Sequence, residues 1–356
     1  MDQSTSSADL LDEIARISSG EVLTADEAEA AFHRIMGGGV SSVQMAAFLV
    51  ALRTRGVAPV EVAGGVRALR RAMIPVTVAD PDTLVDTCGT GGGQISTFNV
   101  STAAALVAAG GGVRVAKHGN RSFTSRSGSA DVLEALGVRI DLSPEEMSRV
   151  LGEVGIVFMF APLLHPAMRH VGPVRRELRL PTIMNLLGPL TNPAGARRQV
   201  VGVSDPSLLP LVAGALKELG HLRAMVVHGE AGMDEISPLG TTRIAWVDEG
   251  GLVEQRVEPE ELGVERVSPA DVALAGGSPE ENASVIQQIL EGRLKGAGRT
   301  LVILNAAAAF HVSGVAADLR EGAALAADSL DSGSALRSLD ALRASSHGGG
   351  GDHPGS

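Results

Sequence analysis

The stretch TLVDTCGTGGGQISTFNVSTAAALVAAGGGVRVAKHGN, residues 83–120, contains one complete unit of alternating structure. The short run TLVDT predicts a strand, and it leads into a glycine-rich loop. The alanine-rich segment TAAALVAAG then predicts a helix, and VRVAK predicts a second strand. A strand, a crossover helix and another strand are typical of a parallel sheet, so this stretch predicts an α/β domain.

The same alternation continues along the chain. Strands are predicted in IVFMF, QVVGV, RAMVV, TRIAW and TLVILN, and helical patterns such as SADVLEALG, SPEEMSRVLGEVG and LLPLVAGALKELG lie between several of them. This order favours a largely parallel central sheet. We therefore expect residues 76–345 to form a large α/β domain.

The first part of the chain differs, because only helical patterns occur in it. Thr24 with Glu27, and Ser41 with Gln44, have the spacing of capping boxes ahead of apolar helical runs. Residues 1–75 are therefore predicted to form a small all-helical domain.

Composition limits the class of protein. The net charge of −11 over 356 residues argues against a nucleic-acid-binding surface. The single cysteine, Cys88, excludes an intramolecular disulfide and fits a reducing compartment. No signal peptide is evident, and the most apolar run is too short to span a bilayer. We expect a soluble cytoplasmic protein whose low-complexity end, residues 346–356, is disordered.

Two polar segments follow the first two predicted strands of the α/β domain. The glycine-rich loop can present backbone N–H groups to an anion ahead of a helix N-terminus. The segment KHGNRSFTSRSGSAD, residues 117–131, adds the cations Lys117, Arg121 and Arg126 among small hydroxyl side chains. Together they favour a site for an anion such as a diphosphate. The glycine-rich loop is neither a Walker loop nor GxGxxG, so ATP and NAD sites are not indicated.

Several motifs resemble those of the anthranilate phosphoribosyltransferases. In the order of that family, and within residues 86–237, the chain contains GTGG…TFNVST, KHGNRS, SRSGSADVLEALG, HPAMRHVGPVRREL, NLLGPLTNPA and VVHGEAGMDEIS. The resemblance implies the fold of the nucleoside phosphorylase and phosphoribosyltransferase type, with a small helical domain and a large α/β domain. It further implies that residues 162–190 return to the helical domain, and that two copies form a homodimer through the helical domains.

The resemblance also implies a reaction. The family transfers the phosphoribosyl group from 5-phosphoribosyl 1-diphosphate to the amine of anthranilate, giving N-(5-phosphoribosyl)anthranilate and diphosphate in tryptophan biosynthesis. The leaving diphosphate carries charge that Mg²⁺ can neutralise. Two magnesium ions per subunit are expected, held by Ser101, Asp234 and Glu235.

By the same resemblance, a larger set of residues binds the substrates. No general acid or base is assigned, because the aromatic amine is already neutral at pH 7. Transition-state stabilisation is attributed to Lys117, Arg175 and magnesium. Asn120 and Arg175 match the contacts to anthranilate, and His118, His165 and His170 are candidates for the acceptor path. The substrate-binding set is Gly89, Gly92, Gly93, Thr97, Asn99, Val100, Ser101, Thr102, Lys117, His118, Gly119, Asn120, Arg121, Ser122, Phe123, Thr124, Ser125, Ser129 and Arg175.

Gly93 departs from the family pattern, in which GTGG is normally followed by an aspartate. The missing carboxylate would sit among phosphates and magnesium. Three outcomes are open: a weaker or differently placed metal, compensation by a residue such as Asp86, or impaired donor binding. With the other motifs intact, we expect a working enzyme with altered magnesium dependence.

Two other functions stay open at this point. One is an enzyme of a different specificity, either a nucleoside phosphorylase or a phosphoribosyltransferase that acts on a related aromatic acid in a specialised pathway. The other is a non-catalytic relative that binds nucleic acid, against which the negative net charge argues.

Overall fold

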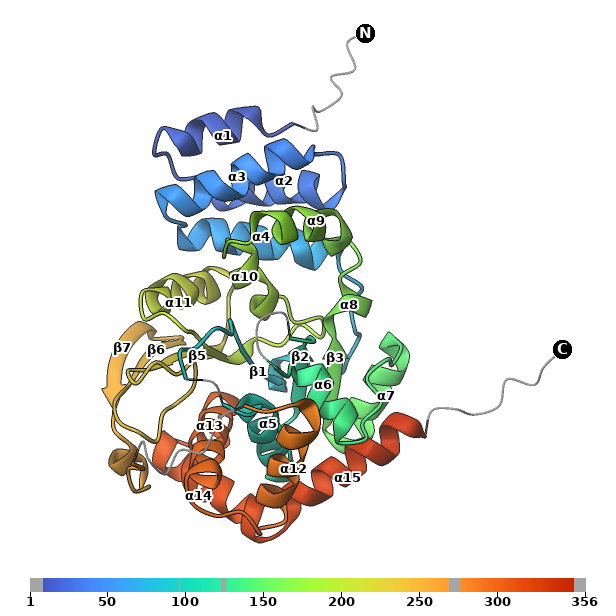
Figure 1. Cartoon of the computed structure of the whole chain (residues 1–356), viewed down its shortest axis with the longest axis vertical. Coiled ribbons are helices and arrows are strands. Elements are labelled where there is room, and N and C mark those ends of the chain that lie inside the picture. Colours follow the sequence, from blue (N-terminus) through green and yellow to red (C-terminus); the bar gives the residue numbers. More distant parts are fainter. Residues whose placement is uncertain (1–8, 96, 123–125, 269–275, 349–356) are drawn as a thin grey trace, which may run out of the picture.

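The computed structural model describes residues 9–95, 97–122, 126–268 and 276–348. A bundle of helices forms one end of the molecule and a larger α/β body forms the other (Figure 1). The body is built around a seven-stranded sheet in the order β3-β2-β1-β4-β5-β6-β7. The fold prediction of a small helical domain and a large α/β domain with a largely parallel sheet is therefore confirmed.

The first five strands of the sheet run parallel to one another, and the last two are antiparallel additions at one edge. The strands are β1 (Val85–Gly89), β2 (Val115–Gly119), β3 (Ile156–Phe160), β4 (Arg198–Gly202), β5 (Arg223–Gly229), β6 (Thr242–Asp248) and β7 (Gly251–Val257). Because β1 to β5 are parallel, the loops that follow them all leave the sheet at the carboxyl ends of these strands, which form its convergent edge.

Helices connect the strands and cover both faces of the sheet. They are α5 (Val100–Gly110), α6 (Ser129–Ala135), α7 (Pro144–Val154), α8 (Ala161–Leu164), α9 (Met168–Leu178), α10 (Met184–Leu187), α11 (Leu208–Glu218), α12 (Pro279–Leu290), α13 (Ala297–Ser313), α14 (Leu319–Asp331) and α15 (Ser334–His347). Short 3₁₀ segments within the described residues are η1 (Pro81–Thr83), η2 (Gly188–Leu190) and η3 (Pro259–Leu262).

The small domain contains α1 (Leu11–Ser18), α2 (Ala25–Met36), α3 (Ser42–Arg55) and α4 (Pro59–Ala72). Thr24 and Glu27 form the predicted capping box at the start of α2. At the start of α3, Ser41 accepts the N–H of Gln44, but the return bond is missing. The Gln44 amide oxygen instead accepts the backbone N–H of Leu10, which ties α1 to α3.

Two hydrophobic cores lie on opposite faces of the sheet. One is formed by α5, α13 and the helices around them, against inward side chains such as Met225 and Val227. The other joins the opposite face, through Val201 and Val226, to α11 and to the helical bundle. Helix α4 packs on α11, so the small domain is continuous with the sheet.

The segment between β3 and β4 returns to the small domain. Helix α9 packs against α2 and α3, and α10 packs against α4. Val171, Val174 and Leu187 are buried in the same core as Phe32 of α2. Helices α9 and α10 therefore share a hydrophobic core with the helical bundle.

One predicted strand is wrong. TLVILN lies inside α13, a helix whose residues 301–310 are all buried. A helix enclosed on every side needs no polar face, so its sequence shows no helical periodicity of apolar residues. In the absence of that periodicity, the β-branched Val302 and Ile303 favoured a strand. The alanines that follow, Ala306–Ala309, favour the helix.

Two further features differ from the prediction. Strand β7 was missed because it is an edge strand with exposed side chains and only weak alternation. The predicted tail began at residue 346, but Ser346 and His347 belong to α15. Ser346 is buried and its hydroxyl accepts the N–H of Arg139, so the helix continues to that contact. Residues 349–356 lie outside the described residues.

None of the described helices is long and apolar enough to cross a bilayer. The longest, α13, contains 17 residues.

The contact between α2 and α4 depends on Gly64. A Cβ atom there would lie 2.4 Å from the carbonyl oxygen of Ala25 and 2.8 Å from the backbone nitrogen of Glu29. We expect Gly64→Ala to lower the free energy of unfolding by about 1–3 kcal/mol through overpacking. Gly152, on the exposed side of α7, has nothing within 4 Å of the same atom. Gly152→Ala should raise the free energy of unfolding by about 0.5–1 kcal/mol.

Chemical denaturation of both variants checks the pair. Equal effects of the two substitutions would contradict the close approach of α2 and α4, because both replace a helical glycine by alanine.

Candidate active site

Four of the five parallel strands end in glycine at the edge where their loops meet: Gly89, Gly119, Gly202 and Gly229. Each of these glycines has another chain segment directly against it. A Cβ at Gly202 would lie 1.8 Å from the Asp234 carbonyl oxygen, and one at Gly119 would lie 2.2 Å from Ser129 Oγ. The loops therefore converge more closely than residues with side chains would allow.

The glycine-rich loop lies across the ends of β1 and β4. Gly91 and Gly92 have φ of +67° and +88°, a conformation that favours glycine. The Thr90 N–H donates to the Gly202 carbonyl at 2.9 Å, and the Gln94 N–H donates to the Gly232 carbonyl at 2.8 Å. The loop is thereby held between β4 and the turn after β5, and it leads into the N-terminus of α5, which no side chain caps.

Lys117 on β2 is the central cation of the edge. Its side chain is only 3% exposed, and its ammonium group donates to the Thr87 carbonyl, to Thr87 Oγ1 at 3.3 Å and to Ser101 Oγ at 3.3 Å. Burial lowers the pKa of Lys117, whereas the nearby carboxylates of Asp86 and Glu235 act to raise it. A buried ammonium group needs such partners.

Asp234 and Glu235 occupy the turn after β5, and both are partly buried. The Glu235 carboxylate accepts the Ser101 backbone N–H. Burial, followed by the charge of Asp234, raises the pKa of Glu235 to about 8. Burial also raises the pKa of Asp234. Within the described residues no salt bridge reaches either carboxylate, although the nearby charge of Lys117 acts to lower the pKa of Glu235.

This donor set fits a magnesium ion. Two adjacent carboxylates offer the hard oxygen ligands that Mg²⁺ prefers, and a divalent cation would offset the cost of burying them together. In the part of the chain that the structure describes, no cluster of three or more His, Cys, Asp or Glu side chains is present. The remaining ligands would therefore come from the Ser101 hydroxyl, phosphate oxygens and water.

Asp86 does not replace the aspartate that is absent at position 93. It is fully buried, and its oxygens accept the His118 backbone N–H at 3.1 Å and the Asn192 side-chain amide at 2.9 Å. Burial raises the pKa of Asp86 to about 6 against the opposing effect of Lys117. Its role is to tie β1 to β2 and to the segment that precedes β4.

The second polar segment is held by side chains of its own. Asn99 donates to the Ser127 carbonyl at 3.1 Å and accepts the Ser127 hydroxyl at 3.2 Å, which joins the loops after β1 and β2. Asp131 accepts the backbone N–H groups of Ser122 and Gly128 at 3.2 and 2.8 Å. These bonds fix the start and the end of the loop after β2.

The acceptor side contains Arg175 and two histidines. Nε2 of His118 and Nε2 of His165 lie 3.1 Å apart, and both rings are buried. Burial lowers the pKa of His118 to about 3 and that of His165 to about 4, so both are neutral at pH 7. Arg175 on α9 is partly buried, its pKa is lowered by burial, and no salt bridge from the described residues reaches it. A desolvated guanidinium of this kind favours an anionic ligand.

The predicted site residues do not all have the same surroundings. The loop glycines, Ser101, Lys117, Asp234 and Glu235 meet at one edge. Val100 and Thr102 are buried in α5, and Arg121 pairs with Asp131 and Glu134. His170 lies against Gly38 in the bundle. The structure puts Thr97 and Asn120 in the loops after β1 and β2 and Ser129 at the start of α6, whereas Phe123, Thr124 and Ser125 lie outside the described residues.

Three supporting residues were missed: Asp131, Asn192 and Asn305. Asp131 follows SRSGS at a position that resembles a helix cap, and Asn192 lies in the quoted NLLGPLTNPA motif, so both had a signal in the sequence. Asn305 interrupts an apolar run and had only its isolated polarity as a signal.

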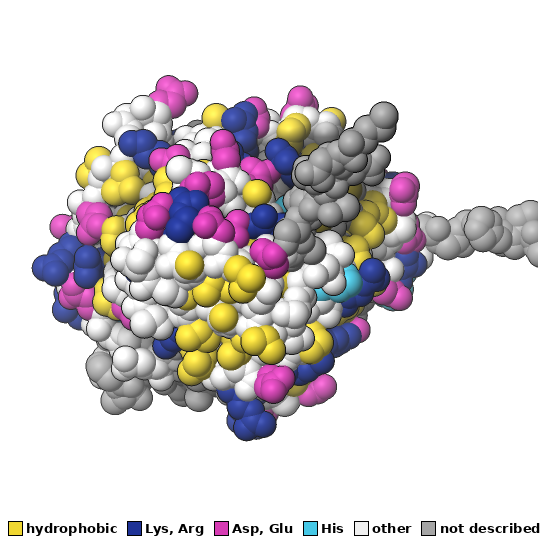
Figure 2. Space-filling view, turned by 90° about the horizontal axis from the view of Figure 1, so that it is seen from above, with side chains coloured by type: hydrophobic (Ala, Val, Ile, Leu, Met, Phe, Trp, Pro, Cys, Tyr) yellow, Lys and Arg dark blue, Asp and Glu magenta, His cyan; other side chains and the backbone are white. Residues whose placement is uncertain are grey.

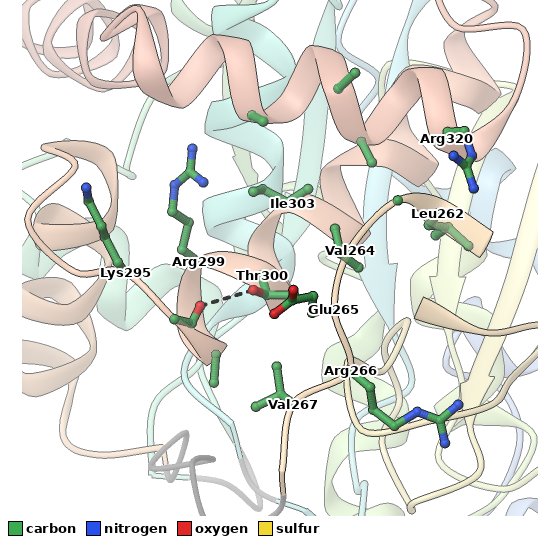
Figure 3. Close-up of a pocket in the computed structure, with 16 residues that line it drawn as sticks. Leu262, Val264, Glu265, Arg266, Val267, Lys295, Arg299, Thr300, Ile303 and Arg320 are labelled. Carbon is green, nitrogen blue, oxygen red and sulfur yellow. Dashed lines mark hydrogen bonds between the residues drawn. The ribbon is translucent and has the colours of Figure 1, made fainter. Parts of the chain in front are cut away.

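A cavity of about 840 Å³ lies elsewhere, between η3 and its following loop, α13 and α14 (Figure 3). None of its lining residues belongs to the motifs above. Two of its arginines are already paired, Arg266 with Glu258 and Glu260, and Arg299 with Asp331. The cavity is therefore separate from the convergent edge of the sheet.

Comparison with known proteins finds similarity along nearly the whole chain. Residues 81–336 match the model of the glycosyl transferase family a/b domain, and residues 11–73 match that family's helical bundle domain. The anthranilate phosphoribosyltransferase of Rubrobacter xylanophilus is 52% identical over 331 residues, which cover 93% of this chain and 96% of that protein.

Solved structures agree with this result. The crystal structure of anthranilate phosphoribosyltransferase from Thermus thermophilus is 47% identical with a TM-score of 0.88, and the match covers 94% of this chain and 99% of that one. The Saccharomyces cerevisiae enzyme in complex with PRPP and Mg is 29% identical with a TM-score of 0.85, over 95% of this chain and 98% of that one.

Proposed function

Because this chain belongs to the anthranilate phosphoribosyltransferase family, we propose that the convergent edge of its sheet binds 5-phosphoribosyl 1-diphosphate with magnesium, beside anthranilate. The protein is a phosphoribosyltransferase of tryptophan biosynthesis, and it transfers the phosphoribosyl group to the amine of anthranilate. Identity of 52% over 93% of the chain is the observation that carries this function. The Saccharomyces relatives, solved with PRPP and Mg and with 4-fluoroanthranilate, support the ligands.

The donor's phosphates and ribose are assigned to the two loops after β1 and β2. The glycine-rich loop and the start of α5 offer backbone N–H groups, and Lys117 offers a fixed positive charge beneath them. As the bond to diphosphate breaks, charge builds up on the leaving group and an oxocarbenium-like sugar forms. Fixed donors at this position need no reorganisation to stabilise that charge.

Magnesium is assigned to Asp234, Glu235 and Ser101, with two ions per subunit as the proposed number. When bound, it neutralises the diphosphate oxygens of the donor and of the leaving group. Ser101 stands between the two parts of the site, because its hydroxyl accepts from Lys117 and its N–H donates to Glu235. Lys117 and the acidic turn are thus both in contact with Ser101.

Anthranilate is assigned to the space between the loop after β2 and α9. Its carboxylate would pair with Arg175, and Asn120 would contact it from the other side. His118 and His165, both neutral, would line the path without placing a positive charge beside the amine. A nucleophilic amine must stay unprotonated, so neutral histidines suit this reaction.

Arg175→Ala tests the acceptor assignment. We expect the KM for anthranilate to rise by about 10- to 100-fold, because a charge-assisted contact of about 1.5–3 kcal/mol is lost. The KM for the donor should stay within about twofold. Arg176, the next residue on α9, is exposed and supplies the matched control. The measurement is anthranilate fluorescence during turnover, and equal kinetics for Arg175→Ala and Arg176→Ala would contradict the assignment.

Gly93 is assigned the role of letting the acidic turn approach the loop. A Cβ at Gly93 would lie 2.9 Å from Asp234 Oδ1 and 3.3 Å from the Gly232 carbonyl oxygen. The carboxylate of Asp234 therefore occupies the space that a side chain at position 93 would need. The working enzyme is expected to bind magnesium with one carboxylate fewer than the usual family pattern provides.

Gly93→Asp is expected to shift the magnesium titration, because its side chain would have to displace the Asp234 carboxylate from the space that this carboxylate now occupies. In the absence of metal, the same variant should unfold at a lower temperature, because the new side chain would crowd the Asp234 carboxylate and place a further acid beside it. Activity against magnesium concentration and metal-free thermal unfolding check the two parts. Coincident magnesium curves for the variant and the original chain would overturn the proposed role of Gly93.

A homodimer through the helical domain is the proposed assembly. Leu11 on α1 and Val43 on α3 are 59% and 79% exposed, and these two helices pack against each other. The view onto this end of the molecule shows apolar side chains gathered between charged ones (Figure 2). An exposed apolar face of this kind is typical of an interface.

Val43→Glu should convert the dimer to a monomer, since a charge at an apolar interface is costly to desolvate. Light scattering should give the mass of one 36.4 kDa chain for the variant and twice that mass for the original chain. Val253→Glu, at an exposed position of the edge strand β7, is the control and should stay dimeric. A monomeric original chain would contradict the proposal.

A further inference from the structure

The turn that carries Asp234 and Glu235 is fixed on four sides. The Gly232 carbonyl accepts the N–H groups of Gln94 and Ile95 at 2.8 and 3.2 Å. Gly202 packs against the Asp234 backbone, and the Ser101 N–H holds the Glu235 carboxylate. These three contacts come from the loop after β1, from β4 and from α5. The fourth comes from α13, on the side of the turn that faces the core.

The fourth contact is made by Asn305. Its Oδ1 accepts the backbone N–H of Ile236 at 2.8 Å, and its Nδ2 donates to the Ile236 carbonyl at 3.0 Å and to the Leu301 carbonyl at 2.9 Å. Asn305 is 3% exposed and Ile236 is 2% exposed, so water does not compete for these bonds. One amide side chain thus pairs with both backbone groups of a residue, as a neighbouring strand would.

We propose that Asn305 is a positioning residue for the reaction, which fixes the direction of the Asp234 and Glu235 carboxylates by holding the peptide groups that follow them. This inference rests on the proposed function, because it assumes that the two acids bind magnesium. Asn305 contacts neither substrate nor metal. It acts through Ile236, whose amide nitrogen is bonded to the carbonyl carbon of Glu235.

The physical reason lies in the charges of the turn. The two acids are adjacent in the chain and both are partly buried, so holding their carboxylates close together is unfavourable until a cation arrives. Without an anchor, the turn would relax by separating the carboxylates, and a metal would then have to pull them together again. Preorganised ligands avoid that cost, which is why a supporting shell changes metal affinity.

The apolar surroundings of Asn305 indicate that this polar side chain has a specific role. It lies in the run LVILNAAAAF, and all the remaining residues of this run are apolar and buried. An amide in such a place costs free energy unless all its bonds are made. Two of its three bonds go to the turn, and only one goes to its own helix. The hydrogen bonds of Asn305 therefore serve mainly to hold the acidic turn and not to stabilise its own helix.

Asn305→Ser is the sharpest variant. A serine hydroxyl in a helix can donate to the carbonyl four residues earlier, so the bond to Leu301 is retained while the shorter side chain loses both bonds to Ile236. Asn305→Ala removes all three. Ser329→Ala is the matched control for stability, because Ser329 is equally buried in the neighbouring α14 and donates one bond to the Val107 carbonyl at 2.8 Å, away from the acidic turn.

The metal is probed without turnover. Mn²⁺ binding is measured by electron paramagnetic resonance in the presence of 5-phosphoribosyl 1-diphosphate and in the absence of anthranilate. We expect Asn305→Ser to weaken Mn²⁺ binding about tenfold, which corresponds to about 1.4 kcal/mol, and to raise the magnesium concentration for half-maximal activity similarly. The KM for anthranilate should change less than twofold. Ser329→Ala should lower the unfolding temperature but leave Mn²⁺ binding unchanged.

The inference is overturned if Asn305→Ser binds Mn²⁺ as tightly as the original chain, or if Ser329→Ala weakens it by the same factor at equal loss of stability. If Asn305→Ser does not fold at the assay temperature, this variant and Ser329→Ala are compared in the same way at reduced temperature.

Asp234→Asn separates this inference from the function on which it rests. If that variant binds Mn²⁺ normally, the proposed metal site is wrong, and the role of Asn305 falls with it. If Asp234→Asn weakens Mn²⁺ binding and Asn305→Ser does not, the metal site stands and only the positioning role of Asn305 is refuted.

Discussion

The ammonium group of Lys117 is the charge on which the arrangement of the site depends. It is buried between Thr87 and Ser101, with the carboxylates of Asp86 and Glu235 nearby. A buried cation is tolerated only where fixed oxygens and negative charge surround it. This requirement holds β1, β2, α5 and the turn after β5 in one register, and the same elements carry the loops that are assigned to the donor.

Glycine at the strand ends makes that arrangement sterically possible. Gly202 admits the Asp234 backbone where any Cβ would clash, and Gly119 admits the hydroxyl of Ser129. Gly93 extends the same principle into the loop, where it leaves room for the Asp234 carboxylate. The site is thus a region of close backbone approach, in which charges are held by neighbouring chain segments and not by long flexible side chains.

The alternation of short strands with helices was sufficient to predict the class of fold. Strands and helices each have a characteristic spacing of apolar side chains, and this spacing can be recognised in the sequence. It failed at TLVILN, where complete burial removes the period, and at β7, where exposure weakens it. The family motifs predicted Lys117, Ser101, Asp234 and Glu235 as neighbours. They could not predict that Asp86 is enclosed, because its partner Asn192 lies 106 residues further along the chain. They also could not predict that Arg121 pairs with acids on α6, because Asp131 lies 10 residues further along and only the fold brings the two together.

Asn305 shows why supporting residues are harder to find than ligands. A metal ligand or a phosphate-binding loop has a chemical type that its sequence displays, such as adjacent acids or repeated glycines. A residue that holds a backbone turn can be any side chain with the right donor and acceptor, placed 69 residues away. Its only sequence signal is a polar side chain in an apolar helix, and that signal identifies a buried bond without naming its partner. The partner becomes evident only when α13 and the turn after β5 are seen together.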